Sequence, residues 1–293
     1  LKILRKLIFL FLYISYISSA QQTLFQSIFH DNIERHYIIH IPDSYNDKLS
    51  FPLVLCFHGY GGNASGMSYT NFNYVSDTAN FIVVYPQGTL MKGKTHWNVG
   101  GWTLDSNTDD LGFIINLLDS LSEKYNINQS RIYSTGMSNG GYMSFLLACQ
   151  LSERIAAIAS VTGSMTPQTF NLCNPKHPTP ILQIHGTNDQ VVPYNGKPKW
   201  TLSINHILEY WINYNNCDIS PTEIFFPDIN INDGSTVKKL TWLNGDSSVV
   251  IEHLIVNGGG HDWFGAWGNM DINSSEEIWR FFSKYDIHGR ISR

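Results

Sequence analysis

Apolar, β-branched segments recur along the chain and predict the strands of a sheet. Seven of them stand out: residues 36–41, 52–57, 81–85, 131–135, 155–161, 180–185 and 249–256. Several are apolar at consecutive positions, which is typical of strands that are covered on both faces. The pattern therefore favours a mostly parallel sheet between two layers of helices.

Helical patterns alternate with these segments. In residues 109–126 the apolar side chains share one stripe, and Asp109 and Asp110 stand at the start, where a helix favours negative charge. Further helices are expected directly after Ser138, at residues 203–215, and at residues 274–285 with a serine cap and an acidic first turn. With no internal repeat and no linker composition, the sequence predicts one α/β domain over residues 21–293.

The first twenty residues differ in character from the rest. Lys2, Arg5 and Lys6 precede an apolar stretch, and the segment closes with the small residues Ser18-Ser19-Ala20. This order is typical of a secretory signal peptide. The alternative is a membrane anchor, but the apolar run is shorter than the ~20 residues that span a bilayer. We therefore expect residues 1–20 to direct export to the periplasm or the medium, with no stable membrane association after cleavage.

Composition narrows the class of protein. The chain has 293 residues, is 43% hydrophobic and 15% charged, and carries a net charge of −5 without a cluster of Lys and Arg. These values fit a packed globular domain and argue against a nucleic-acid partner. Four cysteines are too scattered for a zinc site, so Cys56 is expected in the core and Cys149 is expected to pair with Cys173. No metal or organic cofactor is expected.

The stretch Gly136-Met137-Ser138-Asn139-Gly140 directly follows a predicted strand. Gly-x-Ser-x-Gly between a strand and a helix is the nucleophile-elbow pattern, in which a tight turn leaves the serine exposed at its tip. An ordinary glycine-rich turn is the alternative. A serine hydroxyl becomes a nucleophile only beside a histidine, which itself needs a carboxylate.

Candidates for both partners lie downstream of Ser138. Asp189 follows the strand predicted at residues 180–185, as the acid of such a triad should. The rival carboxylates precede the serine, and two of them suit a helix start; they are Asp105, Asp109 and Asp110. We therefore expect Asp189 to be the acid.

For the histidine, the last predicted strand is followed by three glycines and then His261. Glycines there let the chain reach into a cleft and present the imidazole. The other histidines weighed lack this context; they are His177, His206, His253 and His288. His261 is therefore expected to act as the base.

Acyl transfer also needs hydrogen-bond donors for the oxyanion. The loop His58-Gly59-Tyr60-Gly61-Gly62 follows a predicted strand and matches the oxyanion loop of such enzymes. The backbone N–H groups of Tyr60 and Asn139 are the expected donors. A flexible glycine turn is the alternative. However, this loop, the serine elbow, the Asp189 loop and the His261 loop follow one another in the chain order that acyl transfer by such a triad requires.

With these residues placed, the chain resembles the polyhydroxybutyrate-depolymerase-type esterases, a branch of the α/β-hydrolases that also contains feruloyl and acetylxylan esterases. The resemblance extends from about residue 35 to 282 and rests on five motifs: HWNVGGW, DDLGFI, GMSNGGYM, HGTNDQVVPY and GGGHDWFG. It implies an α/β-hydrolase fold and a triad of Ser138, Asp189 and His261. Three tryptophans within the motifs could line a substrate pocket, although they could equally pack the loops; they are Trp97, Trp102 and Trp263.

The sequence departs from this family in two places. Many relatives carry Cys where this chain has Tyr60, and a late Cys that would pair with Cys217 is absent, so Cys217 is expected to be unpaired. Depolymerases that attack solid polyester typically append a linker and a substrate-binding domain, whereas this sequence ends shortly after its last predicted helix. A crystalline polymer is therefore not the expected substrate.

The sequence thus predicts an exported serine esterase that acts through an acyl-enzyme. Its expected substrates are feruloyl or acetyl esters of plant polysaccharide, or soluble polyester fragments. A peptidase with the same triad and a non-catalytic binding protein on the same fold remain the alternatives. The oligomeric state stays open.

Overall fold

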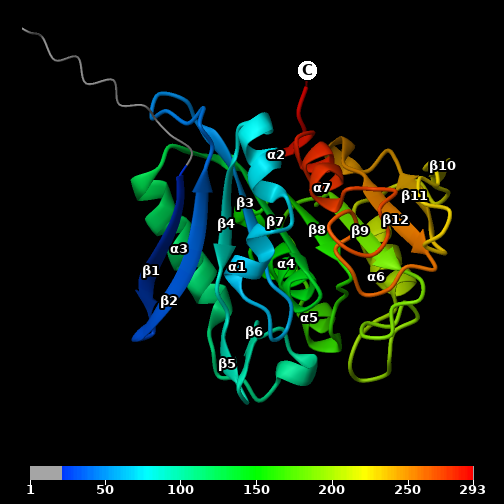
Figure 1. The fold of residues 1–293 in the computed structure, drawn as a ribbon, viewed down its shortest axis with the longest axis horizontal. Coiled ribbons are helices and arrows are strands. Elements are labelled where there is room, and N and C mark those ends of the chain that lie inside the picture. Colours follow the sequence, from blue (N-terminus) through cyan, green and yellow to red (C-terminus); the bar gives the residue numbers. More distant parts are fainter. Residues whose placement is uncertain (1–21, 293) are drawn as a thin grey trace, which may run out of the picture.

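The computed structural model describes residues 22–292 and places a ten-stranded sheet at their centre (Figure 1). The expected signal peptide, residues 1–20, lies outside the described residues. Six parallel strands occupy the middle of the sheet. In sheet order they are β4 (Ile82–Pro86), β3 (Phe51–Phe57), β7 (Ile127–Met137), β8 (Ala157–Val161), β9 (Ile181–Gly186) and β12 (Ile251–Asn257).

Antiparallel strands extend the sheet at both ends. β2 (Ile33–Ile41) pairs with β4 and forms a hairpin with the edge strand β1 (Gln22–His30). At the other end, β11 (Thr236–Trp242) joins β12, and β10 (Thr222–Phe225) forms the second edge. Short two-stranded pairs complete the strands: β5 (Thr89–Met91) with β6 (Lys94–His96), and β13 (Tyr285–Asp286) with β14 (Gly289–Arg290).

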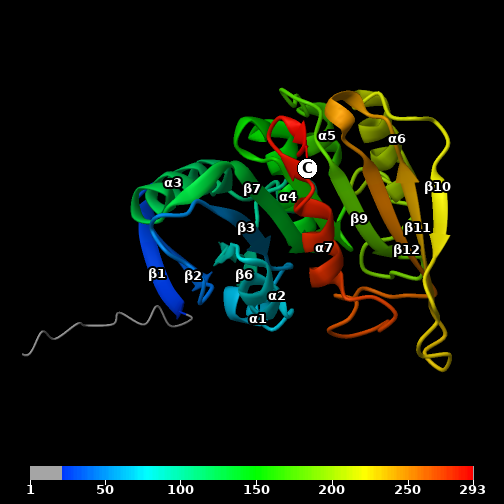
Figure 2. The same cartoon turned by 90° about the horizontal axis from the view of Figure 1, so that it is seen from above.

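Helices cover both faces of the sheet, as expected (Figure 2). One face packs against α3 (Asp110–Lys124), α4 (Asn139–Gln150), α5 (Pro167–Asn171) and α6 (Ile204–Tyr214). The other face packs against α1 (Ala64–Ser68), α2 (Phe72–Ala79) and α7 (Ser274–Phe282). Successive residues of β3 serve the two cores in turn: Leu53 and Leu55 join the first, and Val54 and Cys56 the second.

All seven strands expected in the sequence are present, and the expected helices differ only at their ends. α7 is capped by Asn273, whose side chain accepts from the N–H groups of Ser275 and Glu276, instead of by the predicted serine. Asp109 caps α3 by accepting from Gly112, which confirms its role at a helix start. The α/β-hydrolase fold is thus confirmed.

The cysteines behave as the sequence predicted. Cys149 and Cys173 form a disulfide, and Cys56 and Cys217 are free and buried. Within residues 22–292, none of the helices is both long and apolar enough to cross a bilayer.

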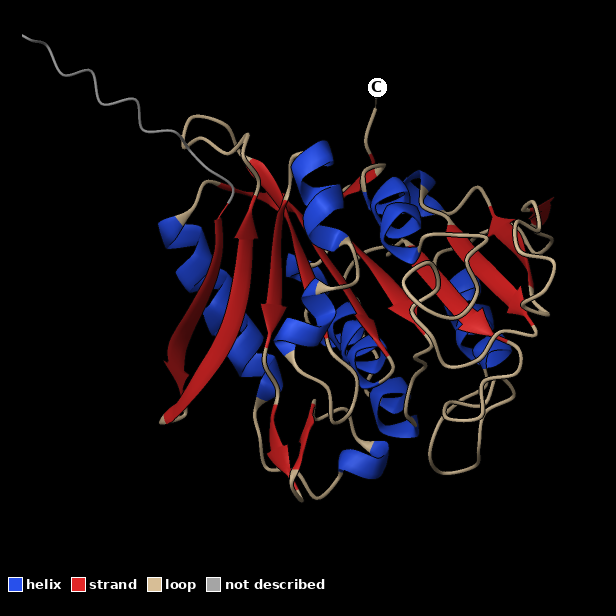
Figure 3. Ribbon diagram, in the orientation of Figure 1, coloured by secondary structure: helices blue, strands red, loops and turns tan. Residues whose placement is uncertain are grey.

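The parallel strands end on a common side of the sheet, toward the lower part of the view (Figure 3). The loops that follow β3, β7, β9 and β12 therefore meet at one edge. In open α/β sheets, ligands bind outside the carboxyl ends of the strands. These four loops carry every residue of the predicted triad and oxyanion hole.

Candidate active site

Ser138 occupies the tight turn between β7 and α4. Its backbone has φ 53° and ψ −120°, a left-handed conformation that a non-glycine residue rarely adopts. The strain is sustained by the neighbouring strand, because the Ser138 N–H donates to the carbonyl of Val161 over 2.8 Å. A serine held in this conformation at a helix start has the geometry of a nucleophile elbow.

The flanking glycines are required by close backbone approaches. A Cβ at Gly140 would lie 2.1 Å from the carbonyl oxygen of Phe57, and one at Gly136 would lie 2.6 Å from the carbonyl carbon of Gly140. Any side chain there would push α4 away from β3. The Gly-x-Ser-x-Gly spacing is therefore explained by packing.

The loop after β3 lies against Ser138. A Cβ built at Gly59 would be 3.3 Å from Ser138 Cβ, which is tighter than an ordinary contact, so a side chain there would press on the nucleophile. His58 holds the loop in place: its Nδ1 donates to the carbonyl of Gly59 and its Nε2 accepts from the N–H of Gly88 at 2.9 Å. Burial lowers the pKa of His58 to about 4, so the ring is neutral near pH 7 and its hydrogen-bonding role is fixed.

The two predicted oxyanion residues both adjoin Ser138. Tyr60 lines the same cavity as the serine. Asn139 is the first residue of α4, and the first N–H groups of a helix have no partner within it. The Asn139 side chain is fixed by the backbone of Trp97, which donates its N–H over 2.7 Å and accepts from the amide over 3.1 Å. That the backbone N–H groups of Tyr60 and Asn139 point at the oxyanion stays a prediction.

Asp189 and His261 meet across the loops that follow β9 and β12. His261 Nδ1 lies 2.7 Å from Asp189 Oδ2. The other carboxylate oxygen, Oδ1, accepts from the backbone N–H groups of Val191 and Val192, each over 2.8 Å. The Asp189 side chain is fully buried, whereas the imidazole is 17% exposed. The acid is thus fixed by backbone donors while the histidine remains accessible.

Ser138 and His261 line one cavity of about 420 Å³. Its apolar walls come from Met67, Met137, Val191 and the partly exposed Trp267. A larger cavity of about 480 Å³ lies between the β1–β2 hairpin and α1, and none of the predicted site residues lines it.

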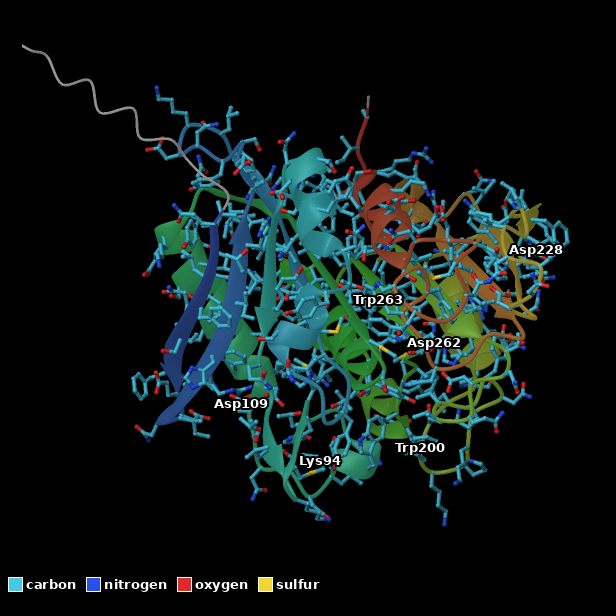
Figure 4. The ribbon with its side chains drawn as sticks, in the orientation of Figure 1. Lys94, Asp109, Trp200, Asp228, Asp262 and Trp263 are labelled. Carbon is cyan, nitrogen blue, oxygen red and sulfur yellow. A yellow bond between two sulfur atoms is a disulfide. The ribbon has the colours of Figure 1, made fainter. Side chains whose placement is uncertain are left out.

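The predicted substrate-binding tryptophans do not line the 420 Å³ cavity. Trp263, which is labelled in Figure 4, is fully buried, and its indole donates to Ser275 Oγ. Trp97 is also fully buried, and its indole donates to the His58 carbonyl. Trp102 packs edge-on against Tyr142. Trp97 and Trp263 have no exposed surface, so the alternative of loop packing fits them better than substrate contact. Substrate contact by the half-buried Trp102 stays a prediction.

The sequence reasoning missed most of the apolar wall. Met137 directly precedes Ser138, and Val191 lies two residues after Asp189, so their positions near the site could have been inferred from the sequence. Met67 comes from α1, and no local signal marks it. Trp267 lies in the same glycine-rich loop as Trp263 but, unlike Trp263, is 39% exposed.

A possible cation-binding group lies away from this cavity. Among residues 22–292, His30, Asp31 and Asp109 bring ligand-type atoms within 4.8 Å of one another at the turn of the β1–β2 hairpin. Two of these side chains have structural roles that need no cation. Asp109 caps α3, and His30 Nε2 lies 3.1 Å from Oδ2 of Asp109. The group contains no member of the predicted triad.

Comparison with known proteins agrees with this geometry. A family model described as Phospholipase/Carboxylesterase matches residues 45–209. A bifunctional acetylxylan esterase/xylanase of Neocallimastix patriciarum is 29% identical over 256 residues, which cover 87% of this chain and 34% of that protein. Feruloyl esterase B of Piromyces equi is 30% identical over 240 residues, covering 78% of this chain and 42% of the relative. The chain thus spans less than half the length of these two relatives.

Solved structures show the same fold. The acetyl xylan esterase from Aspergillus awamori superimposes with a TM-score of 0.64 at 15% identity, covering 89% of this chain and 99% of the other. At this identity the likeness establishes the architecture alone.

Proposed function

The chain belongs to the phospholipase/carboxylesterase family of α/β-hydrolases, and on that premise we propose that it hydrolyses carboxylic esters through an acyl-enzyme formed on Ser138. The observation that carries the proposal is the 2.7 Å contact from His261 Nδ1 to Asp189 Oδ2, together with the cavity that His261 shares with the strained Ser138.

Each residue has a defined part in the proposed reaction. His261 Nε2 takes the proton of Ser138 Oγ as the oxygen attacks the ester carbonyl, and Asp189 stabilises the resulting imidazolium. The amides of Tyr60 and Asn139 stabilise the oxyanion. When the intermediate collapses, the alcohol leaves with the proton from His261. Water then attacks the acyl-enzyme by the same steps in reverse order and releases the acid.

The cavity favours a neutral acyl group. Among the described residues that line it, none is Asp, Glu, Lys or Arg, and thioether, aliphatic and indole groups form its walls. We propose feruloyl or acetyl esters of plant polysaccharide as substrates, in agreement with the acetylxylan esterase and the feruloyl esterase among its relatives. Soluble polyester fragments, which are also neutral, are the second substrate class.

Export is part of the proposal. The disulfide between Cys149 and Cys173 supports it, because disulfides persist mainly in oxidising compartments. Residues 1–20 would then be removed, leaving a single catalytic domain from residue 21. N-terminal sequencing of protein recovered outside an expressing cell tests this, and retention of residues 1–20 contradicts it.

Initial rates on three substrates test the function. Methyl ferulate, acetylated xylan and a 3-hydroxybutyrate oligomer are compared at equal ester concentration, with Ser138→Ala as the control. Preference for ferulate or acetyl-xylan supports the plant-polysaccharide assignment, and preference for the oligomer replaces it with polyester fragments. Wild-type rates equal to those of Ser138→Ala on all three, with no labelling by a fluorophosphonate, contradict the proposed function.

A further inference from the structure

A second buried histidine lies beside the triad acid. His185, on β9, places Nε2 3.4 Å from Asp189 Oδ2 and 2.9 Å from the carbonyl oxygen of Val192. Both side chains of the His185–Asp189 pair have no exposed surface. The proposed mechanism does not use this histidine.

The hydrogen bonds of Gln183 decide which nitrogen of His185 carries the proton. The amide nitrogen of Gln183 is 2.9 Å from the carbonyl oxygen of Gly163, to which it must donate, and 3.1 Å from His185 Nδ1. Nδ1 therefore accepts, and the N–H of the neutral ring is on Nε2. This N–H donates to the Val192 carbonyl, and its nitrogen lies 3.4 Å from Asp189 Oδ2, which is an electrostatic contact. Burial also lowers the pKa of His185 to about 4, so the ring acts as a neutral donor.

The donors around Asp189 divide between its two oxygens. Oδ1 accepts from the amides of Val191 and Val192, while Oδ2 faces His261 Nδ1 and His185 Nε2. Rotation of the carboxylate would break contacts at both oxygens. His185 Nε2 also holds the Val192 carbonyl, so one ring restrains the carboxylate and the loop that supplies its amide donors.

We propose that His185 is a positioning residue that fixes the Asp189 carboxylate for its contact with His261. The catalytic part of this inference rests on the proposed function. His185 itself touches neither substrate nor reacting atoms.

Three variants test the proposal. His185→Leu removes the donor, His185→Gln supplies an amide N–H in its place, and His253→Leu is the matched control. His253 is equally buried on the adjacent strand β12, but its partners are Tyr194 Oη at 2.8 Å and the carbonyl of Gln183 at 3.0 Å. His185→Leu should lower kcat roughly tenfold with KM unchanged, because the Asp189 carboxylate loses the polar Nε2–H group 3.4 Å from Oδ2 and the Val192 carbonyl loses its donor. His185→Gln should recover most of the loss, and His253→Leu should lower stability alone.

A double-variant cycle separates positioning from general packing. If His185 acts through Asp189, His185→Leu should cause little further loss of kcat in an Asp189→Asn background. Full additivity of the two losses, or equal losses of kcat in His185→Leu and His253→Leu, would overturn the proposal.

A spectroscopic measurement does not depend on any activity. The proton shared by His261 Nδ1 and Asp189 gives a downfield proton NMR resonance, which is assigned by its loss in His261→Gln. The resonance should shift in His185→Leu and stay in place in His253→Leu, even if no ester is hydrolysed; an unshifted resonance contradicts the proposal. If His185→Leu fails to fold, Gln183→Met replaces it as the test. This variant removes the hydrogen-bond donor to His185 Nδ1 and should shift the resonance by a smaller amount; an unshifted resonance again contradicts the proposal.

Discussion

Arg35 Nη2 lies 2.6 Å from Asp110 Oδ1 in an ion pair with no more than 2% exposure on either side chain. The pair joins β2 to the first turn of α3. The second oxygen of Asp110 accepts from the N–H of Asn98 over 2.7 Å, so the same carboxylate also holds the loop that leads from β6 to α3.

Arg35→Leu should therefore destabilise the protein strongly. It leaves the Asp110 carboxylate buried without its cation, and breaking such a pair costs about 3–5 kcal/mol. Urea unfolding measures the loss. The exposed pair of Arg154 and Asp119, at 2.8 Å, provides the control, since Arg154→Leu should cost less than about 1 kcal/mol. Equal losses in the two variants would show that the buried pair contributes no more than a surface pair.

Asp189→Asn should lower kcat about 10⁴-fold while leaving the fold intact. The amides of Val191 and Val192 require an oxygen at the Oδ1 position, so the new NH₂ group must face His261 Nδ1. His261 would then carry its proton on Nε2 and could not accept from Ser138. Steady-state rates, with circular dichroism as the check on folding, measure the effect. A loss of less than tenfold would argue against Asp189 as the acid.

Removing the Cys149–Cys173 disulfide should cost about 3 kcal/mol. The bridge closes a loop of sequence separation 24 that connects the end of α4 to the segment after α5. The double variant Cys149→Ala, Cys173→Ala should unfold at lower temperature than the wild type. A reductant should lower the unfolding temperature of the wild type but not that of the double variant. If it lowers both equally, the disulfide is not the cause of the difference in stability.

Stability should fall as the pH is lowered below about 6.5. Burial lowers the pKa of His253 to about 3 and that of His58 to about 4. Between these values and about 6.5 the unfolded chain binds a proton that the folded chain does not, so each histidine removes about 1.4 kcal/mol per pH unit within its window. Unfolding free energies from pH 7 to 4 test the slope. His253→Gln should make the dependence of the unfolding free energy on pH shallower. An unchanged slope would contradict the assignment of part of this dependence to His253.

The sequence predicted the central sheet well because its buried strands are continuously apolar. The edge strand β1 shows neither strand signal: its apolar residues come in the adjacent pairs Leu24-Phe25 and Ile28-Phe29, which give neither a continuous apolar run nor strict alternation. Phe25 and Phe29 are exposed at 73% and 70%. Ser138, Asp189 and His261 could be predicted as the triad because turn chemistry and chain order mark them, and the structure brings them to one edge of the sheet.

Other features depend on the direction in which a side chain points, which spacing does not encode. Trp263 and Trp267 share one glycine-rich loop, yet Trp263 packs against Phe72 in the interior and Trp267 faces the cavity. His185 stands in the same motif as Asp189, but its contact with the carboxylate depends on the loop that returns Asp189 to the end of β9. Such contacts appear only once the tertiary structure is known.

The four loops of the candidate site follow strands that are scattered along the chain, from β3 near its beginning to β12 near its end. Two neighbours in the sheet, β9 and β12, are separated in sequence by α6 and both outer strands β10 and β11. The site consequently has a high contact order, and loop-closure entropy must be overcome before its parts meet. During refolding the strained turn at Ser138 needs β8, which follows it closely in the chain and holds it through the Val161 carbonyl. The contact between Asp189 and His261 instead needs β9 and β12 to pair across the long segment between them.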